Sequence, residues 1–461
     1  MLRNTQVWRW AFLAAISFLP ACAGSPFTGL SSALGGSGRL EVRPDFETSL
    51  VGERPSLFQK AVELEALIQK RHVAQDGLLA YGIGLASPDS EEVIGMAFSD
   101  MAIWSGCYVA AQAFRYAVTG DPAAEKQVRT SVQGLHLLQE VTGKRGLLAR
   151  GIKGWDDENP EKGSNWHRGV GPFSRYQWLG DVSVDQIDGV LFGYAVAYDL
   201  IGDQALRQSI ANHVGAISDH IIGHGMIIQD VDSGPTKHGD LKAGFFSEPL
   251  NSLIALAVVK AAYHMTRDER YQQHYLDLVH VNNYHKRAVR ARDPWWEVFT
   301  GVNHSDNNLA FLAYYTLLRY EDDPVLSGYY LKSLDRTWNV VREEGNPLFT
   351  FIYQSLSPAG NRDAQAIAKA IETLRLFPVD RRNHRVMNST RPEVCKSLWR
   401  DRFDRRQSCR PVPMDLRPAD VFEWKENPYR LDGGGEGNLE FSGVDYLLPY
   451  WMGRYHGFIS E

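Results

Sequence analysis

The sequence has few cysteines and lacks the short motifs of several large enzyme classes. Its 461 residues include only four cysteines, and no two of them stand at the spacing that a zinc site requires. It contains no Gly-x-Ser-x-Gly motif, no His-Glu-x-x-His motif and no dinucleotide-binding glycine fingerprint. These absences argue against a serine hydrolase, a zinc protease and a Rossmann enzyme. The sequence predicts no metal site and no soluble cofactor.

An excess of positive charge is also lacking. The formal net charge is −6 at pH 7, and the sequence pI is about 6.2. Because nucleic-acid-binding domains usually carry a strong basic patch, this balance predicts no nucleic-acid partner. Aromatic residues make up 11% of the chain, and they suit either a protein core or a surface that stacks on sugar rings.

No apolar run is long enough to span a membrane, since a spanning helix needs about 20 apolar residues. The run from Trp10 to Leu19 follows two arginines and ends in the sequence Leu-Pro-Ala-Cys22. This arrangement resembles the signal peptide and lipobox of bacterial lipoproteins. The resemblance implies that residues 1–21 are a signal peptide and that Cys22 carries a lipid anchor; an ordinary signal peptide is the alternative. Because Ala23 and not Asp follows the cysteine, we expect an outer-membrane protein that faces the periplasm or the cell surface.

The rest of the chain divides into a tether and one domain. Residues 22–54 are rich in Gly, Ser and Pro, which predicts a flexible tether. Residues 55–461 are expected to form a single domain with a polar insertion at about residues 377–430. From Arg381 to Arg410 the chain has ten Lys or Arg against three Asp or Glu. This insertion is either a solvated segment or a contact surface for an anionic glycan or lipid headgroup.

Two of the cysteines, Cys395 and Cys409, lie in this polar insertion. An oxidising compartment outside the cytoplasm would allow them to form a disulfide. We therefore predict that this pair closes the insertion.

One junction recurs in the helical part of the sequence. An apolar helical stretch ends in a short turn, and an Asp then precedes a more polar helical stretch. The aspartates are Asp121, Asp203, Asp268 and Asp323. Asp at this position accepts hydrogen bonds from the free N–H groups of the following helix. The pattern therefore predicts a series of helical hairpins.

The two helices of each predicted hairpin differ in polarity. The first is apolar on all sides, as in residues 190–200, 253–262 and 309–318, and such a helix is buried. The second is amphipathic, as in residues 124–140 and 204–222. We therefore expect the apolar helices to form a buried inner ring and the amphipathic helices to form an outer ring around it. This all-α architecture resembles the (α/α)6 toroid of helical hairpins, which includes many glycoside hydrolases and polysaccharide lyases; an α-solenoid is the alternative.

In such a toroid, the long connections before the inner helices surround the mouth of the ring, where we expect the site. Asp181, Asp185 and Asp188 precede or open one inner helix, and they share a face if that helix extends back to residue 181. Close carboxyl groups raise one another's pKa, which keeps an acid available near neutral pH. We predict Asp185 and Asp188 as catalytic residues and Asp181 as substrate-binding, with helix capping as the alternative.

Other polar residues precede the remaining inner helices. His304 is a candidate acid or base because histidine titrates near neutral pH. Asp100, Asp240 or Asp306 could be the catalytic partner of the aspartates named above. Ser305 or Asp306 is expected to cap the helix beside His304. Candidates for substrate binding are Trp104, Arg168, Trp178, His238, Asn303, Asp306 and Arg454.

These features together predict an enzyme that cleaves a poly- or oligosaccharide. In a glycoside hydrolase, one carboxylic acid protonates the leaving oxygen while a carboxylate activates water or attacks the sugar. In a lyase acting on an acidic glycan, His304 or His238 with a tyrosine would move the proton, and Asn303 or Arg168 would neutralise the substrate carboxylate. The sequence leaves both chemistries open. The alternative is a non-catalytic glycan-binding or envelope-assembly lipoprotein, and in either case we expect a monomer.

Overall fold

The computed structural model describes residues 55–74, 76–156, 165–244, 248–292, 302–358 and 362–460. These residues belong to one compact unit, residues 44–461. The expected signal peptide, Cys22 and the tether lie outside the described residues. Within the described ranges, no helix is both long enough and apolar enough to cross a membrane.

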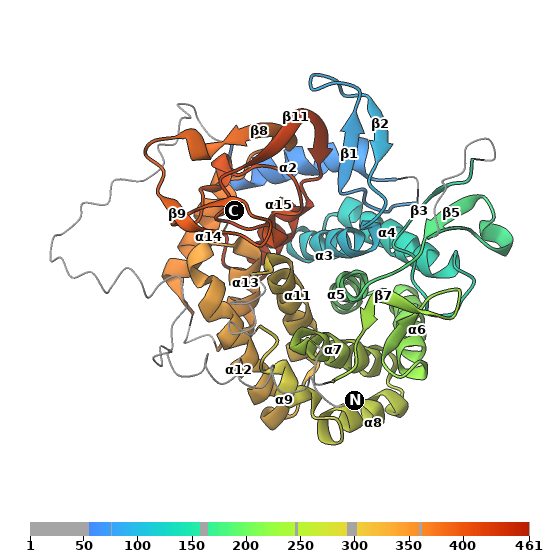
Figure 1. The fold of residues 1–461 in the computed structure, drawn as a ribbon. Helices are drawn as coiled ribbons and strands as arrows, with labels where there is room; N and C mark the ends of the chain where they lie inside the picture. The colour runs from blue at the N-terminus through green and yellow to red at the C-terminus, as the bar shows by residue number, and fades with distance from the viewer. Residues whose placement is uncertain are drawn as a thin grey trace, which may run out of the picture. The chain divides into compact units, whose positions relative to one another are not determined.

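The centre of the unit is a closed ring of helices. The inner helices are α3 (Met101–Thr119), α5 (Val184–Leu200), α7 (Pro249–Thr266), α11 (His304–Tyr320), α13 (Pro347–Leu356) and α15 (Val444–Tyr455). Each helix contacts the next in this order, and α15 packs against α3, so the ring closes on itself. Figure 1 shows α3, α5, α7 and α11 following one another around the ring.

A second set of helices packs on the outside of this ring. The outer helices are α2 (Leu57–Leu67), α4 (Pro122–Glu140), α6 (Gln204–Gly223), α8 (Glu269–His280), α12 (Pro324–Val341) and α14 (Ala364–Leu376). Helices α4, α6, α8, α12 and α14 each contact the inner helix that precedes them, and α2 contacts α15. The short helix α9 (Tyr284–Ala288) lies beside α7 and α12. The fold is therefore an all-α toroid of helical hairpins, as the sequence predicted.

The predicted aspartate caps are present at the turns between inner and outer helices. Each side chain accepts a hydrogen bond of 2.6–2.9 Å from a backbone N–H in the first turn of the outer helix. These capping residues are Asp121, Asp203, Asp268 and Asp323. The caps satisfy N–H groups that have no partner inside the helix, which explains why the junction recurs in the sequence.

Helices α3 and α5 approach each other closely because glycines stand where they cross. A Cβ atom on Gly106 of α3 would lie 2.1 Å from the carbonyl oxygen of Gly189 on α5. A Cβ atom on Gly193, one turn further along α5, would lie 2.4 Å from the carbonyl oxygen of Gly106. No other residue fits at these three positions without moving a backbone, so the glycines fix the distance between the first turns of the two helices.

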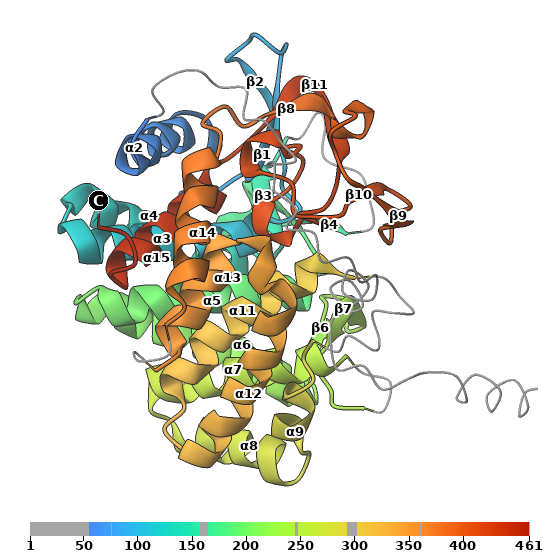
Figure 2. The same ribbon diagram turned by 90° about the vertical axis from the view of Figure 1, so that its left-hand side faces the viewer.

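Short antiparallel strands occupy the long connections. The strands are β1 (Gly82–Leu85), β2 (Val93–Met96), β3 (Gly151–Gly154), β4 (Trp166–Arg168), β5 (Tyr176–Leu179), β6 (Ile227–Gln229), β7 (Pro235–Asp240), β8 (Arg382–Met387), β9 (Lys396–Arg400), β10 (Arg406–Ser408) and β11 (Asp432–Phe441). They form the sheets β2-β1-β11-β8, β3-β5-β4, β6-β7 and β10-β9. Figure 2 shows these strands gathered on one side of the helices. We call this side, from which the chain enters the inner helices, the mouth.

The polar insertion is built from strands and single turns of helix. It contains β8, β9 and β10 and the short helices η5 (Asn388–Thr390), η6 (Met414–Leu416) and η7 (Glu423–Lys425). The predicted disulfide joins Cys395 and Cys409, and Cys107 is a buried free thiol. Further short helices elsewhere are η1 (Ile68–His72), η2 (Gly171–Phe173) and η3 (Arg342–Glu344).

Candidate active site

Two carboxyl groups at the mouth are joined by an arginine that sequence reasoning missed. Asp100 stands immediately before α3, and Ser183 stands immediately before α5. The Arg150 guanidinium donates to Asp100 Oδ1 at 2.7 Å and to Ser183 Oγ at 3.2 Å. The Ser183 hydroxyl in turn donates to Asp185. Arg150 therefore ties the first turns of α3 and α5, and their carboxyl groups, into one network.

Gln186 supplies a second link between these helices. Its Nε2 donates to Asp100 Oδ1 at 3.0 Å, and its Oε1 accepts the backbone N–H of Ile103 at 3.1 Å. Asp100 thus receives two donors, while its side chain keeps 30% of its surface exposed. Asp185 is also partly exposed. The two carboxyl groups are held in place and still reach solvent, which a group that acts on a substrate requires.

Asp188 lies one turn deeper in α5 and is only 3% exposed. Burial, and next the negative charge of Asp185, raise the pKa of Asp188 well above its usual value. Its Oδ2 has no hydrogen-bond partner among the described residues. A carboxyl group in this setting holds its proton to a higher pH than an exposed aspartic acid does. The catalytic role expected for Asp188 stays a prediction.

Asp181 does not join this face of α5, contrary to the sequence prediction. The helix begins at Val184, and Asp181 has a φ of 56°, which is a left-handed backbone conformation. Its backbone N–H donates to Asp230 Oδ2 at 2.7 Å, and its Oδ1 accepts the N–H of Lys237 at 2.7 Å. Through these two hydrogen bonds, Asp181 holds the β6–β7 hairpin at the start of α5.

The other predicted acid, Asp240, and the predicted binder His238 lie on β7. Both side chains are exposed. Asp240 accepts the backbone N–H of Lys242 at 2.8 Å, which is a local turn contact. In the described part of the chain, no hydrogen bond joins either side chain to the network of Asp100 and Asp185. Strand β7 contacts α5, so both residues lie near the cluster without a hydrogen bond to it, and their roles stay predictions.

The start of α11 is held by a buried arginine. Arg292 donates to Asn307 Oδ1 at 2.7 Å, to Asp306 Oδ2 at 3.2 Å and to the Asn303 carbonyl at 3.2 Å. Asn303 is the residue before the helix, in place of the predicted cap Ser305 or Asp306, and its side-chain amide donates to Asp306 at 2.6 Å. Asn303 and Asp306 therefore hold the helix start, and their polar atoms are engaged with protein partners.

His304 opens α11 and is neutral at physiological pH. Burial, and next the positive charge of Arg292, lower the pKa of His304 to about 3. Of the alternatives predicted for a lyase, His304 and Asn303 are neighbours at the start of α11, where the side-chain amide of Asn303 is engaged with Asp306. His238 lies on β7, and Arg168 lies on β4 with its guanidinium 4.5 Å from the ring of Trp155.

The insertion covers the part of the mouth at the starts of α3 and α15, which the sequence did not predict. Phe422 stacks on Trp104 with ring centroids 4.2 Å apart and planes at 16°. The ammonium of Lys425 lies 5.3 Å from the Trp104 ring, and η7 contacts α11. Trp104 is only 2% exposed. Trp104 was expected to bind substrate, but residues 422–425 cover its ring in this arrangement.

Buried charges hold these residues in place at the start of α15. Asp445 Oδ2 accepts from Arg381 at 2.9 Å, from the Tyr81 hydroxyl at 2.9 Å and from the backbone N–H of Glu423 at 3.2 Å. Burial raises the pKa of Asp445, while Arg381 opposes that rise. The indole N–H of Trp424 donates to the Asp445 carbonyl at 2.5 Å. We call Phe422, Glu423, Trp424 and Lys425 the plug.

Two further predicted binders are also not at an open mouth. Trp178 on β5 is buried, and its ring lies 4.6 Å from that of His167. Arg454 lies in the last turn of α15, away from the start of the helix at the mouth, and donates to the Tyr450 hydroxyl at 3.0 Å. Their roles in substrate binding therefore stay predictions that the positions of the two residues do not support.

Comparison with known proteins adds a fold-level likeness and no more. No family model and no curated protein matches the sequence. Among the solved structures that match are a glycosyl hydrolase family 88 protein from Bacteroides vulgatus (12% identity, 87% of this chain and 99% of that chain, TM-score 0.42) and a sugar epimerase from a ruminal bacterium (10%, 87% and 98%, 0.45). An inactive variant of an α-1,6-mannanase from Salegentibacter, in complex with α-1,6-mannotriose, also matches (10%, 87% and 100%, 0.42). At these identities and scores, the functional argument rests on the residues of this chain.

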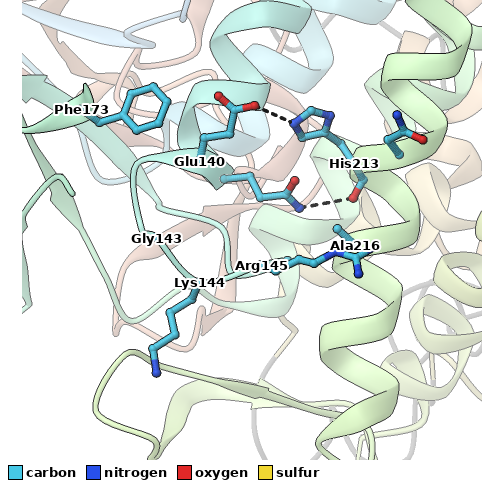
Figure 3. Close-up of a pocket in the computed structure, with 10 residues that line it drawn as sticks. Glu140, Gly143, Lys144, Arg145, Phe173, His213 and Ala216 are labelled. Carbon is cyan, nitrogen blue, oxygen red and sulfur yellow. Dashed lines mark hydrogen bonds and ion pairs between the residues drawn. The ribbon is translucent and has the colours of Figure 1, made fainter. Parts of the chain in front are cut away.

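A separate surface groove of about 520 Å³ lies between the outer helices α4 and α6. Figure 3 shows Glu140 and Phe173 on one side and His213 on the other. Glu140 lies 3.4 Å from His213, and the His213 ring stacks on that of His136 at 3.6 Å. Burial lowers the pKa of His136 to about 3. The groove contains a carboxylate and cations but none of the carboxyl groups at the mouth.

Proposed function

We propose that the protein is a carbohydrate-active enzyme, a glycoside hydrolase that cleaves a poly- or oligosaccharide at the mouth of the toroid. The observation that carries this proposal is the network in which Arg150, Ser183 and Gln186 link Asp100 to Asp185, with the buried Asp188 one turn deeper in α5. Glycosidases use two carboxyl groups in different protonation states on either side of the scissile bond. This network holds two exposed carboxyl groups from different helices in fixed positions.

The proposed roles differ among the three aspartates. Asp100 and Asp185 are partly exposed and would contact the sugar, one as proton donor and the other as nucleophile or base. Asp188 is buried behind them and acts as a positioning residue. Because burial raises its pKa and favours its neutral form, it adds little negative charge next to Asp185. An amide at this position would therefore serve almost as well as the acid, which is not true of Asp100 or Asp185.

The test is the release of reducing ends from a panel of neutral and uronate-containing glycans. Asp100→Asn and Asp185→Asn should each lower kcat by about 100-fold or more, the usual contribution of a general acid or base. Asp240→Asn is the matched control, because that carboxyl group is exposed and bonds only to its own turn. If both network variants match the wild type on a cleaved glycan, the site assignment is wrong.

The plug favours a second candidate function, a non-catalytic glycan-binding lipoprotein. Phe422 covers Trp104, the aromatic ring best placed to stack on a sugar at the start of α3. A protein that binds glycan at its surface needs no open lumen. Binding of glycans to the wild type and to the Asp100→Asn and Asp185→Asn variants with equal affinity, and without cleavage of any glycan in the panel, would favour this candidate over the hydrolase.

We also propose that the chain is exported and anchored through Cys22 in the outer membrane. The support is the N-terminal pattern of two arginines, a short apolar run and Cys22. Metabolic labelling with palmitate should mark the wild type and leave Cys22→Ser unlabelled. Labelling of both chains, or of neither, would contradict the anchor.

A further inference from the structure

The insertion carries a hairpin that stands apart from the helical ring. Strands β9 and β10 pair antiparallel, and the disulfide Cys395–Cys409 closes them at one end. The backbone N–H of Cys409 also donates to the carbonyl of Cys395 at 3.0 Å. We call residues 395–409 the tip hairpin. Figure 2 shows β9 and β10 at the edge of the molecule on the mouth side.

The tip hairpin exposes large apolar side chains within a few residues of one another. Leu398 is 99% exposed, Trp399 is 70% exposed and Phe403 is 62% exposed. Neighbouring residues of a strand point to opposite faces, so Leu398 and Trp399 show that neither face of the hairpin is covered. Soluble proteins rarely expose such side chains together unless the surface binds something.

The same segment carries a surplus of positive charge. Residues 391–410 include seven Lys or Arg against three Asp or Glu. The aspartates are engaged within the hairpin: Asp404 lies 3.5 Å from Arg400, and Asp401 lies 2.6 Å from Arg405. The guanidinium of Arg402 lies over the Phe403 ring at 4.8 Å, and Arg406 is exposed. Positive charge therefore surrounds the exposed apolar side chains.

We propose that the tip hairpin docks on an anionic lipid surface. Tryptophan prefers the interface between water and lipid, exposed leucine and phenylalanine gain by entering the acyl region, and arginine is attracted to anionic headgroups. A glycan would favour the two aromatic rings, but it would gain little from a fully exposed leucine on a convex hairpin. The hairpin thus matches a membrane surface better than a sugar polymer.

The turn of the hairpin is linked to the mouth through η7. Arg405 donates to Glu426 at 3.1 Å, and Glu426 directly follows η7. Helix η7 in turn contacts α11. Docking would therefore hold the mouth of the toroid beside the bilayer, independently of any lipid on Cys22.

The experiment measures binding of the full chain to vesicles, with Cys22→Ser in every protein so that no acyl chain contributes. Vesicles of phosphatidylcholine alone are compared with vesicles that also contain phosphatidylglycerol. We expect the reference chain to bind the anionic vesicles about tenfold more tightly than the neutral ones, and the preference should weaken in high salt. Leu398→Ser, Trp399→Ser and Phe403→Ser combined should remove most binding, and Arg402→Gln with Arg406→Gln should remove the preference for anionic vesicles.

The matched control is Ile94→Ser, which removes an apolar side chain that is 68% exposed on β2 of another hairpin. It should bind as the reference chain does. Identical thermal unfolding of all variants separates lost docking from lost folding. Equal vesicle binding by the reference chain and the triple variant would overturn the proposal. So would loss of binding to an anionic polysaccharide in the triple variant, if vesicle binding is unchanged.

Discussion

Two parts of the mouth each contain an arginine–carboxylate contact at the start of an inner helix, but one contact is open to solvent and the other is buried. At the starts of α3 and α5, Arg150 joins Asp100 and Asp185 while both carboxyl groups keep contact with solvent. At the start of α15, Arg381 and Asp445 pair at 2.9 Å with almost no exposure, under the plug. An arginine–carboxylate contact at the end of an inner helix is therefore not in itself a sign of catalysis. Exposure separates a candidate site from a structural pair.

The largest expected effect comes from breaking the buried pair. Arg381→Met leaves Asp445 buried without its cation, and removal of one partner of such a pair costs about 3–5 kcal/mol of stability. Urea unfolding measures this loss. Arg382→Met is the matched control, because its side chain is 21% exposed and lies 3.8 Å from its carboxylate partner; it should cost about 1 kcal/mol or less. Equal losses in the two variants would show that burial does not distinguish these arginines.

Removing the central ring of the plug should have the next largest effect. Phe422→Ala deletes a fully buried ring stacked on Trp104, at a cost of about 3 kcal/mol. Trp104 would then be exposed, so quenching of tryptophan fluorescence by iodide should increase. Phe403→Ala removes a ring that is 62% exposed and should leave stability unchanged. If Phe422→Ala also raises glycan binding, the plug limits access to the mouth.

Arg150→Met tests the open part of the mouth. Asp100 keeps the hydrogen bond from Gln186, so we expect a stability loss of only about 1 kcal/mol. Activity on a cleaved glycan should fall about tenfold, equivalent to about 1.4 kcal/mol of transition-state stabilisation, because the two carboxyl groups lose their shared support. Arg168→Met, which removes an exposed guanidinium, is the control. A stability loss as large as that of Arg381→Met would assign Arg150 to structure alone.

The smallest expected effect belongs to Asp188→Asn, and it depends on pH. The pKa of Asp188 is raised in the folded state, so the folded chain binds this proton more tightly than the unfolded chain does. Its contribution to stability is complete below the unfolded pKa of about 3.9 and is lost as the pH rises through the raised folded pKa. Asp188→Asn should therefore show a smaller fall in stability with rising pH than the wild type, measured by urea unfolding at several pH values. Asp240→Asn should leave the slope unchanged.

The hairpin architecture could be predicted from the sequence because its signals are local. Asp121 and Asp323 cap helices that begin at the next residue, and each is followed by a proline that suits the first helical position. The stretches that form α5 and α7 are apolar on all sides, and this local pattern identified them as inner helices. These patterns need no knowledge of distant residues.

The site could be predicted only in part because its contacts are not local. Asp185 and Asp188 were found from their spacing, but Arg150 pairs with Asp100 across 50 positions and Gln186 pairs with it across 86. No local pattern shows that Phe422 covers Trp104. Asp181 was misplaced because its left-handed backbone and its contact with Asp230 end the run of possible helix.

Closure of the ring by α15 has a consequence for how the chain matures. Helix α3 is the first of the six inner helices in the chain, yet it packs against α15, near the end of the chain. A contact between segments so far apart in sequence is slow to form, and it cannot form before the last helix has been made. The polypeptide therefore stays incompletely folded throughout its synthesis.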